Sequence, residues 1–248
     1  IRPVRSYADI EQNQADGVMS ALLTGEEGEI TMGNPDFLYF LYKLGMRMMT
    51  LTWNYENSLG FPNVRLDKKS SASSDRYCMS QNEGLKEQGI VFLEEMERLG
   101  MIIDVSHLSD AGFYDVLEHT TKPFVASHSN ARSVCPAVRN LTDDMVRRLA
   151  ERGGITGINF CKEFLGKPDV SQNYLDQAVV HMKYLMNLGG EDFVALGSDF
   201  DGITRYHDLS DCSVMPKLVH TMKKAGLTPT QIEKICYKNT LRVYRELL

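Results

Sequence analysis

The chain has 248 residues, of which 43% are hydrophobic and 24% are charged, and its formal net charge is -6. This size and balance fit one globular domain. Acidic and basic residues are interspersed and no apolar run approaches the roughly 18 residues of a membrane span, so we expect neither nucleic-acid binding nor a membrane-spanning segment.

Five cysteines lie far apart and form no CxxC pair. This spacing argues against a disulfide framework and against a thiolate zinc site. We therefore expect a reducing compartment, and the cytoplasm is the expected location. The chain opens on Ile1 and shows no signal peptide, which predicts that a leader was removed or that Ile1 is not the natural start.

Strand and helix patterns alternate through the first half of the chain. Asn34 followed by proline is a typical helix start, and Gly45 is a typical helix stop. The long polar segment after the second strand is of a kind that is usually functional or mobile. The expected elements are a short helix at 6–14, a buried strand at 19–24, a helix from Asn34 to Gly45, a strand at 46–53, a polar loop at 54–82 and a helix at 84–99.

Two apolar runs in the middle of the chain each end near a histidine. MIIDVSH finishes at His107, and PFVASHSNAR passes through His128, 21 positions later. Between them Ser109 is a typical N-cap for a helix with Phe113 and Val116 on one face. The pattern predicts a strand, a crossover helix and a second strand, with one imidazole at the carboxyl end of each strand. Ligands and metals are held at these ends in parallel α/β proteins.

The second half continues the alternation. The expected elements are a helix from Thr142 to Gly153, a strand at 154–160, a helix at 175–188, a strand leading into Asp199 and Asp201, a helix at 214–225 and a final helix from Thr228. Six strands are predicted, and strict alternation favours a parallel sheet covered by helices. An eight-stranded barrel needs two more strands. An open doubly wound sheet favours a glycine-rich phosphate loop, which the acidic GEEGEITMG matches poorly.

Several polar residues follow predicted strands and are candidates for chemistry. A hydrolytic metal centre needs imidazoles and carboxylates as ligands, and one further carboxylate to take a proton from water. The candidates are Glu26 or Glu27, Trp53, His107, His128, Asn159 and Asp199.

Each candidate also has a structural interpretation. A single histidine after a strand is more often a core or capping residue, and two at successive strand ends make the two interpretations about equal. Arg139 fits either a surface charge or a bidentate clamp for a carboxylate. Glu27 fits a solvated turn, and Asp201 fits a residue that ties its own loop. The remaining histidines are expected to be structural or on the surface: His119, His181, His207 and His220.

Four motifs together resemble the membrane (renal) dipeptidase family of zinc peptidases, particularly its bacterial members: MIIDVSH, SHSNAR, VRNLTDD and GSDFDG, with LLTGEEGE before them. The resemblance implies a single domain over 1–248, an α/β (β/α)8 TIM-type barrel whose first two βα units are missing. It implies two zinc ions bridged by Glu26 and a hydroxide, with His107 and His128 as ligands of one of them. Asp199 would accept and donate the proton, and Arg139 would hold the terminal carboxylate of a dipeptide.

The chain departs from the family pattern at the first strand. The family carries a His-x-Asp pair there, whereas no histidine precedes His107 in this chain. We therefore expect one zinc or none here, bound by His107 and His128. Trp53 and Phe164 stand where some animal members have a histidine and a tyrosine that contact substrate.

The leading functional expectation is zinc-dependent hydrolysis of dipeptides. The alternatives are a truncated, non-catalytic remnant of such an enzyme and another metal-dependent amidohydrolase. The missing strands predict unpaired edges at the strand ending near Thr24 and at the strand ending near Asp199. Open edges favour pairing with another chain, so a homo-oligomer or another association through these edges is expected.

Overall fold

The computed structural model describes residues 1–64, 82–170, 172–204 and 208–248. The chain divides into two compact units, one made of Ile1–Val125 with Arg242–Leu248 and the other of Ala126–Leu241. Most of the predicted polar loop at 54–82 lies outside the described residues, as does His207.

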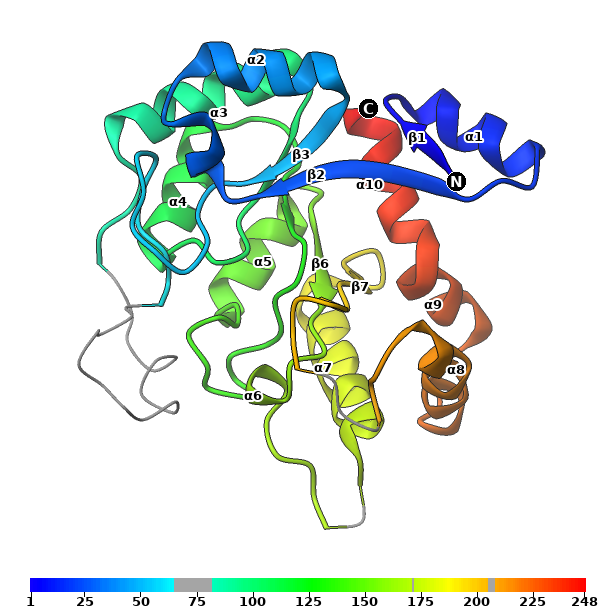
Figure 1. Ribbon diagram of the computed structural model, residues 1–248. Coiled ribbons are helices and arrows are strands. Elements are labelled where there is room, and N and C mark those ends of the chain that lie inside the picture. The colour runs from blue at the N-terminus through cyan, green and yellow to red at the C-terminus, as the bar shows by residue number, and fades with distance from the viewer. Residues whose placement is uncertain (65–81, 171, 205–207) are drawn as a thin grey trace. The chain divides into compact units, whose positions relative to one another are not determined.

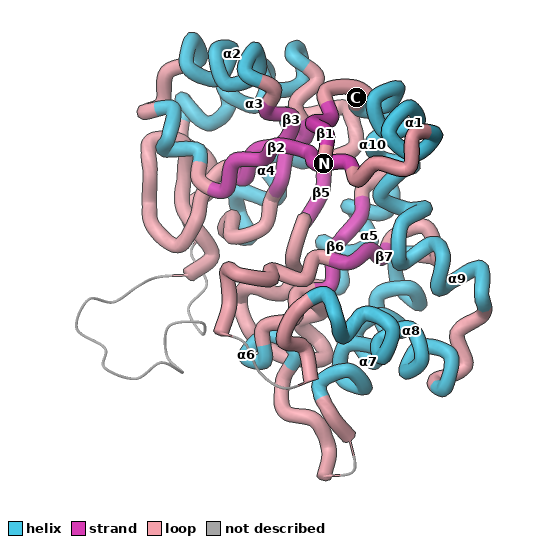
Figure 2. Tube along the Cα trace, turned by 45° about the vertical axis from the view of Figure 1, so that its right-hand side comes forward, coloured by secondary structure: helices cyan, strands magenta, loops and turns pink. Residues whose placement is uncertain are grey.

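The first unit is built on parallel strands that pair in chain order (Figures 1 and 2). Glu26 pairs with Thr50, and Thr50 pairs with Asp104, so three neighbouring strands end at the same level. This register brings the residues that follow these strands to one edge of the sheet. The strands are β1 (Arg2–Val4), β2 (Ser20–Glu26), β3 (Met46–Thr50), β4 (Ile102–Asp104) and the start of β5 (Val125–Ala126).

Helices connect these strands and begin at the predicted caps. The Asn34 side chain accepts a hydrogen bond from the Asp36 N–H, and the Ser109 side chain accepts one from the Gly112 N–H. Gly45 ends its helix at a φ of 114°, a conformation that glycine adopts without strain. The helices are α1 (Tyr7–Ala15), η1 (Gly28–Thr31), α2 (Pro35–Leu44), α3 (Glu87–Leu99), α4 (Asp110–His119) and the end of α10 (Asn239–Leu247).

The apolar faces of these helices and strands form the core of the first unit. Burial of such side chains is the main favourable contribution to folding, and it stabilises the fold by about 25 cal/mol per Å² of apolar surface removed from water. The fully buried side chains include Leu38 on α2, Phe92, Leu93 and Met96 on α3, Met49 on β3 and Val116 on α4.

The second unit contains the end of β5 and a parallel pair of strands. Thr156, Gly157 and Ile158 of β6 (Ile155–Ile158) pair with the three residues of β7 (Val194–Leu196). The remaining elements are α5 (Asp143–Glu151), α6 (Lys162–Leu165), α7 (Tyr174–Gly189), η3 (Cys212–Val214), α8 (Met215–Lys224), α9 (Pro229–Glu233), the π-helical turn η4 (Lys234–Lys238) and the start of α10.

Two glycines let the chain after β5 pass close to β6 and β7. A Cβ atom at Gly157 would lie 2.0 Å from the carbonyl oxygen of Ser127, and one at Gly197 would lie 1.9 Å from it. Both positions therefore exclude a side chain, because real Cβ atoms never come so near. The Ser129 N–H donates to the Gly157 carbonyl at 2.9 Å, which fixes the segment that carries His128.

The parallel α/β class is confirmed, but the count of six strands is wrong. The described residues contain seven strands, and the additional one is β1, which pairs with Ser20, Ala21 and Leu22 of β2. A strand of three residues shows no alternation in the sequence, so only its partner reveals it. The predicted unpaired edge at the strand ending near Thr24 is therefore wrong for residues Ser20, Ala21 and Leu22, which pair with β1.

The expectation that 19–24 is a buried strand is also wrong. Met19 is 69% exposed and Leu23 is 52% exposed, and in β2 only Gly25 is buried. An apolar run in the sequence predicts a buried strand. The exposure of its side chains in the fold depends on whether another element covers them. Among the described residues, no helix combines the length and the apolar character needed to cross a membrane.

Candidate functional site

Backbone strain is concentrated at the ends of the strands. Outside glycine, positive φ angles occur at Glu27 (149°), His107 (71°), Asp199 (59°) and Asp201 (70°), with Met32 (50°) as a further case in η1. Such conformations cost on the order of 1–3 kcal/mol each and persist where surrounding contacts hold them. Glu27 and His107 lie just beyond strands of the first unit, and Asp199 lies just beyond a strand of the second.

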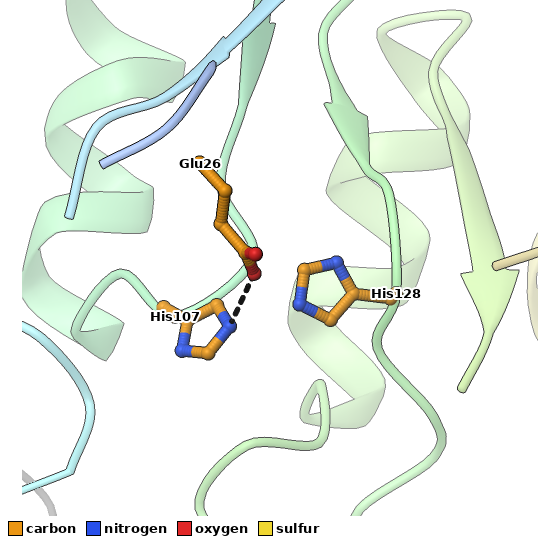
Figure 3. Close-up of side chains that lie close together, drawn as sticks. All are labelled: Glu26, His107 and His128. Carbon is orange, nitrogen blue, oxygen red and sulfur yellow. Dashed lines mark hydrogen bonds and ion pairs between the residues drawn. The ribbon is translucent and has the colours of Figure 1, made fainter. Parts of the chain in front are cut away.

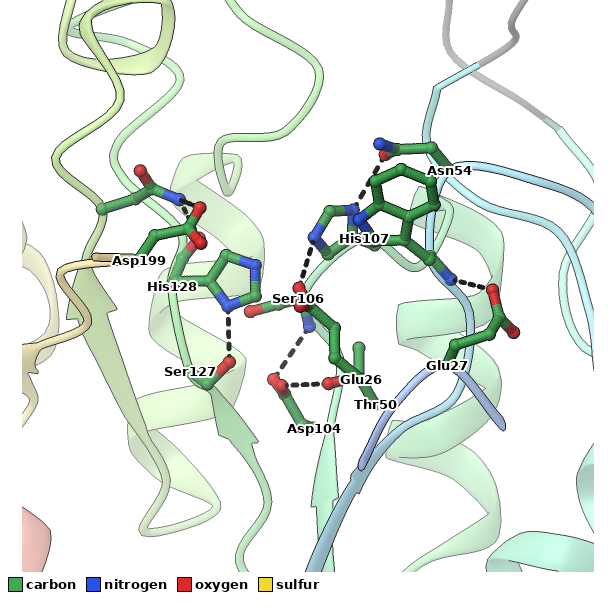
Figure 4. A network of polar contacts seen from close by, with 12 residues as sticks. Glu26, Glu27, Thr50, Asn54, Asp104, Ser106, His107, Ser127, His128 and Asp199 are labelled. Carbon is green, nitrogen blue, oxygen red and sulfur yellow. Dashed lines mark hydrogen bonds and ion pairs between the residues drawn. The ribbon is translucent and has the colours of Figure 1, made fainter. Parts of the chain in front are cut away.

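Glu26 and His107 are brought together in the first unit, at the ends of β2 and β4. Nε2 of the His107 ring lies 3.1 Å from Oε1 of Glu26 (Figure 3). Its Nδ1 lies 2.9 Å from Oδ1 of Asn54 (Figure 4). In the tautomer that carries its proton on Nδ1, the ring donates to Oδ1 of Asn54. The Nε2 lone pair can then serve a metal, and the Glu26 carboxylate beside it supplies negative charge.

A buried carboxylate supports the turn that carries His107. Asp104, the last residue of β4, accepts a hydrogen bond from the Thr50 hydroxyl at 2.6 Å and one from the Ser106 N–H at 3.0 Å (Figure 4). Thr50 is the last residue of β3, so this carboxylate joins two strand ends to the turn. The sequence alone does not single out Thr50 or Asp104, because nothing in the apolar runs around them shows which strand lies alongside.

Glu27 is half-buried, and its side chain makes structural hydrogen bonds within the turn. Its carboxylate accepts hydrogen bonds from the N–H groups of Glu29 and Trp53, both at 3.0 Å, and from the side-chain amide of Asn57. It therefore holds the turn after β2 against the chain after β3. The Trp53 ring lies 6.3 Å from the His107 ring between centroids.

His128 follows β5 in the second unit. Its side chain is buried, and its Nδ1 lies 2.7 Å from the hydroxyl oxygen of Ser127. The main-chain carbonyl oxygen of His128 accepts a hydrogen bond from the side-chain amide of Asn159 at 3.3 Å. The Ser127 hydroxyl thus contacts the ring of His128, while Asn159 holds its main chain. Hydrogen-bond partners of this kind orient imidazoles in metal sites.

Asp199 lies after β7 in the same unit, and Asn159 connects it to His128. The side-chain amide of Asn159 donates to Oδ2 of Asp199 at 3.0 Å, while it also donates to the His128 carbonyl. Asn159 was among the strand-end candidates, but the sequence assigned it no role. Only the pairing of β6 with β7 shows that it lies beside Asp199.

Arg139 is buried at 2% exposure, so the interpretation as a surface charge is wrong. Its guanidinium lies over the ring of Phe164, with Cζ 5.4 Å from the ring centroid. The loop that carries it is fixed by Arg132, whose guanidinium donates to the carbonyl groups of Asn140 and Val138 at 2.8 and 2.9 Å. A buried and stacked arginine is typical of sites that recognise a carboxylate.

The other titratable groups near these residues are structural. Burial, with Glu163 as a further cause, raises the pKa of the Cys161 thiol to about 12, so this cysteine stays protonated. The Cys161 thiol donates to the Glu163 carboxylate at 3.0 Å. His181 is buried in α7, as expected for a structural histidine, whereas His119 and His220 are exposed.

A family model for the membrane dipeptidases, peptidase family M19, matches residues 1–247. A Klebsiella pneumoniae protein described as an uncharacterized protein in the pqqA 5' region is 36% identical over 100% of this chain and 89% of its own length. A dipeptidase of Claviceps purpurea is 34% identical over 95% of this chain and 54% of its own length. The chain thus spans about half the length of that relative.

A solved structure shows the same fold over the whole chain. It is a metallo peptidase from Rhodobacter sphaeroides liganded with a phosphinate mimic of the dipeptide L-Ala-D-Ala. The TM-score between the two structures is 0.88 and their sequences are 30% identical. The match covers 100% of this chain and 69% of the metallo peptidase chain. The chain therefore belongs to the membrane dipeptidase family, peptidase family M19, and shares the α/β fold of its metallopeptidases.

Proposed function

We propose that this protein is a zinc-dependent dipeptidase in which Glu26, His107 and His128 bind the metal. The observation that carries the proposal is the contact between Glu26 and His107, a carboxylate beside an imidazole whose other nitrogen is held by Asn54. Carboxylate and imidazole are the ligand types of catalytic zinc. Family membership over residues 1–247 supports the same assignment.

Asp199 is the proton carrier in this proposal. A bound metal would supply Lewis acidity and an activated water. Asp199 takes the proton that the attacking water loses and passes it to the nitrogen of the leaving amine. Its position after β7, in a strained backbone conformation and hydrogen-bonded to Asn159, supports this role.

Arg139 is the residue that binds the free carboxylate of the substrate. Its planar guanidinium offers a pair of parallel N–H donors that match a carboxylate. Stacking on Phe164 limits the orientations of this group, which favours recognition of a substrate end in one geometry.

The experiment measures zinc content and hydrolysis of a simple dipeptide by the purified full-length protein, together with the same dipeptide amidated at its C-terminus. We expect bound zinc that falls in His107→Ala and His128→Ala, and hydrolysis of the free acid but not of the amide. Arg139→Lys should raise KM for the free acid about tenfold, because one ammonium replaces two parallel donors. Asp199→Asn should lower kcat by about 10² to 10⁴ with zinc retained.

Three results would contradict the proposal. A protein without bound zinc or hydrolysis would support the non-catalytic remnant. Equal turnover of the acid and the amide would favour a different amidohydrolase. An Asp199→Asn variant with full kcat would show that Asp199 does not carry the proton.

A further inference from the structure

Asn159 lies just beyond β6, is fully buried, and uses every polar atom of its side chain. Its Nδ2 donates to Oδ2 of Asp199 at 3.0 Å and to the main-chain oxygen of His128 at 3.3 Å. Its Oδ1 accepts from the Cys161 N–H at 2.7 Å. One amide group therefore meets both residues that the proposed function places in this unit at the strand ends.

The orientation of this amide follows from its partners. A backbone N–H can only donate, so the amide oxygen must face Cys161 and the amide NH₂ must face Asp199 and the His128 carbonyl. Oδ2 of Asp199 is thereby an acceptor and does not carry the proton of a neutral carboxyl group.

A second asparagine holds the backbone of Asn159. The Asn159 N–H donates to Oδ1 of Asn130 at 2.9 Å, and Nδ2 of Asn130 donates to the Asn159 carbonyl at 2.9 Å. The Asn130 N–H in turn donates to Oδ1 of Asn140 at 3.3 Å. All three asparagines are buried at 0–1% exposure, and a buried polar network with its bonds made is rigid.

The other side of Asp199 is closed by a glycine. A Cβ atom at Gly202 would lie 2.3 Å from Oδ1 of Asp199, so only glycine leaves room for this carboxylate. The Gly202 N–H also donates to the Asp199 carbonyl at 3.1 Å. The absence of a side chain at Gly202 thus provides the space that the Asp199 carboxylate occupies.

We infer that Asn159 is a positioning residue that orients the Asp199 carboxylate for proton transfer. This inference rests on the proposed function. Asp199 takes the proton from the attacking water and gives it to the leaving amine nitrogen, so Asp199 ends as it began, and Asn159 keeps both of its amide protons throughout. Without the Asn159 donor, the Asp199 side chain could turn away from the substrate.

The test replaces Asn159 by leucine, which has a similar shape and no polar atoms, in the full-length zinc-loaded protein. We expect kcat for a simple dipeptide to fall about 10²-fold, as for other preorganised donors, while KM changes less than about threefold and zinc content stays constant. In a crystal structure of the variant, the Asp199 carboxylate should have turned from its present position.

Asn239→Leu is the matched control. Asn239 is also buried in the second unit, and its side-chain amide donates to the carbonyl groups of Glu191 and Val194. Its loss should lower Tm as Asn159→Leu does, yet leave kcat per zinc-loaded molecule and the Asp199 orientation unchanged. An equal fall in kcat in both variants, or an unmoved Asp199 in Asn159→Leu, would overturn the inference.

A double-mutant cycle separates this inference from the proposed function. If Asn159 acts through Asp199, adding Asn159→Leu to Asp199→Asn should lower kcat less than about twofold further. A further fall as large as in the single variant would show a general structural role and overturn the inference alone. Full kcat in Asp199→Asn would overturn the role of Asp199 and, with it, the inference. If Asn159→Leu does not fold, Asn159→Ala, which is smaller and also lacks the amide donor, is measured in its place, and the same outcomes apply.

Discussion

At the scale of single residues, the chain places its proposed functional groups where backbone strain is held by side-chain contacts. His107 and Asp199 have positive φ angles, which residues with a side chain adopt only with strain. The His107 ring contacts the side chain of Asn54, and the Asp199 carboxylate accepts a hydrogen bond from Asn159. The cost of the backbone conformation is thus offset by hydrogen bonds that also orient the functional group. Substitution of either partner is expected to affect orientation before it affects folding.

His181 gives a pH dependence of stability. Burial lowers the pKa of its ring from 6.5 to about 4, against a smaller opposing effect of the Leu165 carbonyl. Its Nδ1 accepts from the Ala131 N–H at 3.1 Å, and its Nε2 lies 3.0 Å from the Leu165 carbonyl, which fits a neutral ring. Above pH 6.5 the ring is neutral in both folded and unfolded chains. Below pH 6.5 only the unfolded chain takes up the proton.

The free energy of unfolding should therefore fall as pH decreases from 6.5 to 4, by about 3 kcal/mol from this group, and level off below pH 4. Urea unfolding at several pH values measures the slope. His181→Gln should reduce the slope over this range, whereas His119→Gln, at an exposed histidine of α4, should leave it unchanged. Equal slopes in the wild type and His181→Gln would refute the assignment.

At the scale of elements, the helix boundaries follow from local capping. The sequence predicts helix starts at Asn34, Ser109, Thr142 and Thr228. Each of these side chains accepts a hydrogen bond from an N–H of the first turn. A cap is a contact between residues two or three apart, so the sequence alone contains it.

Thr142 offers a test at this scale. Its hydroxyl oxygen accepts from the Met145 N–H at 3.2 Å at the start of α5, whose apolar face buries Met145, Val146 and Leu149. Thr142→Ala should lower the free energy of unfolding by about 1 kcal/mol, because the Met145 N–H loses its partner. Thr142→Ser keeps the acceptor and should cost much less. Equal losses in the two variants would show that the cap does not contribute.

At the scale of the whole molecule, several apolar side chains near the N-terminus are exposed. Ile1 is 85% exposed, Met19 69% and Leu23 52%. Exposed apolar side chains on a strand favour association with another chain. We expect the chain as written to self-associate through this surface, defined here as Ile1, Met19 and Leu23.

Light scattering over a range of concentrations measures the association. Replacing Met19 and Leu23 together by glutamate should lower the average mass, because two charges then oppose contact. Val170→Glu is the control, since Val170 is also exposed but lies in a loop of the second unit. A wild-type chain that stays monomeric at all concentrations would show that this surface does not drive association.

The sequence by itself determined the class of fold, most helix boundaries and the residues that follow the strands. Periodicity, caps and glycine stops are local, and strands of a parallel sheet share one carboxyl edge, so Glu26, His107, His128 and Asp199 could be singled out without coordinates. The tertiary structure decided which side chains hydrogen-bond to these residues and which strands pair. The Thr50–Asp104 and Asn159–Asp199 hydrogen bonds join residues 54 and 40 positions apart, and β1 exists only through its pairing with β2. The burial of Arg139 and the exposure of β2 likewise depend on neighbours distant in sequence, which no local pattern contains.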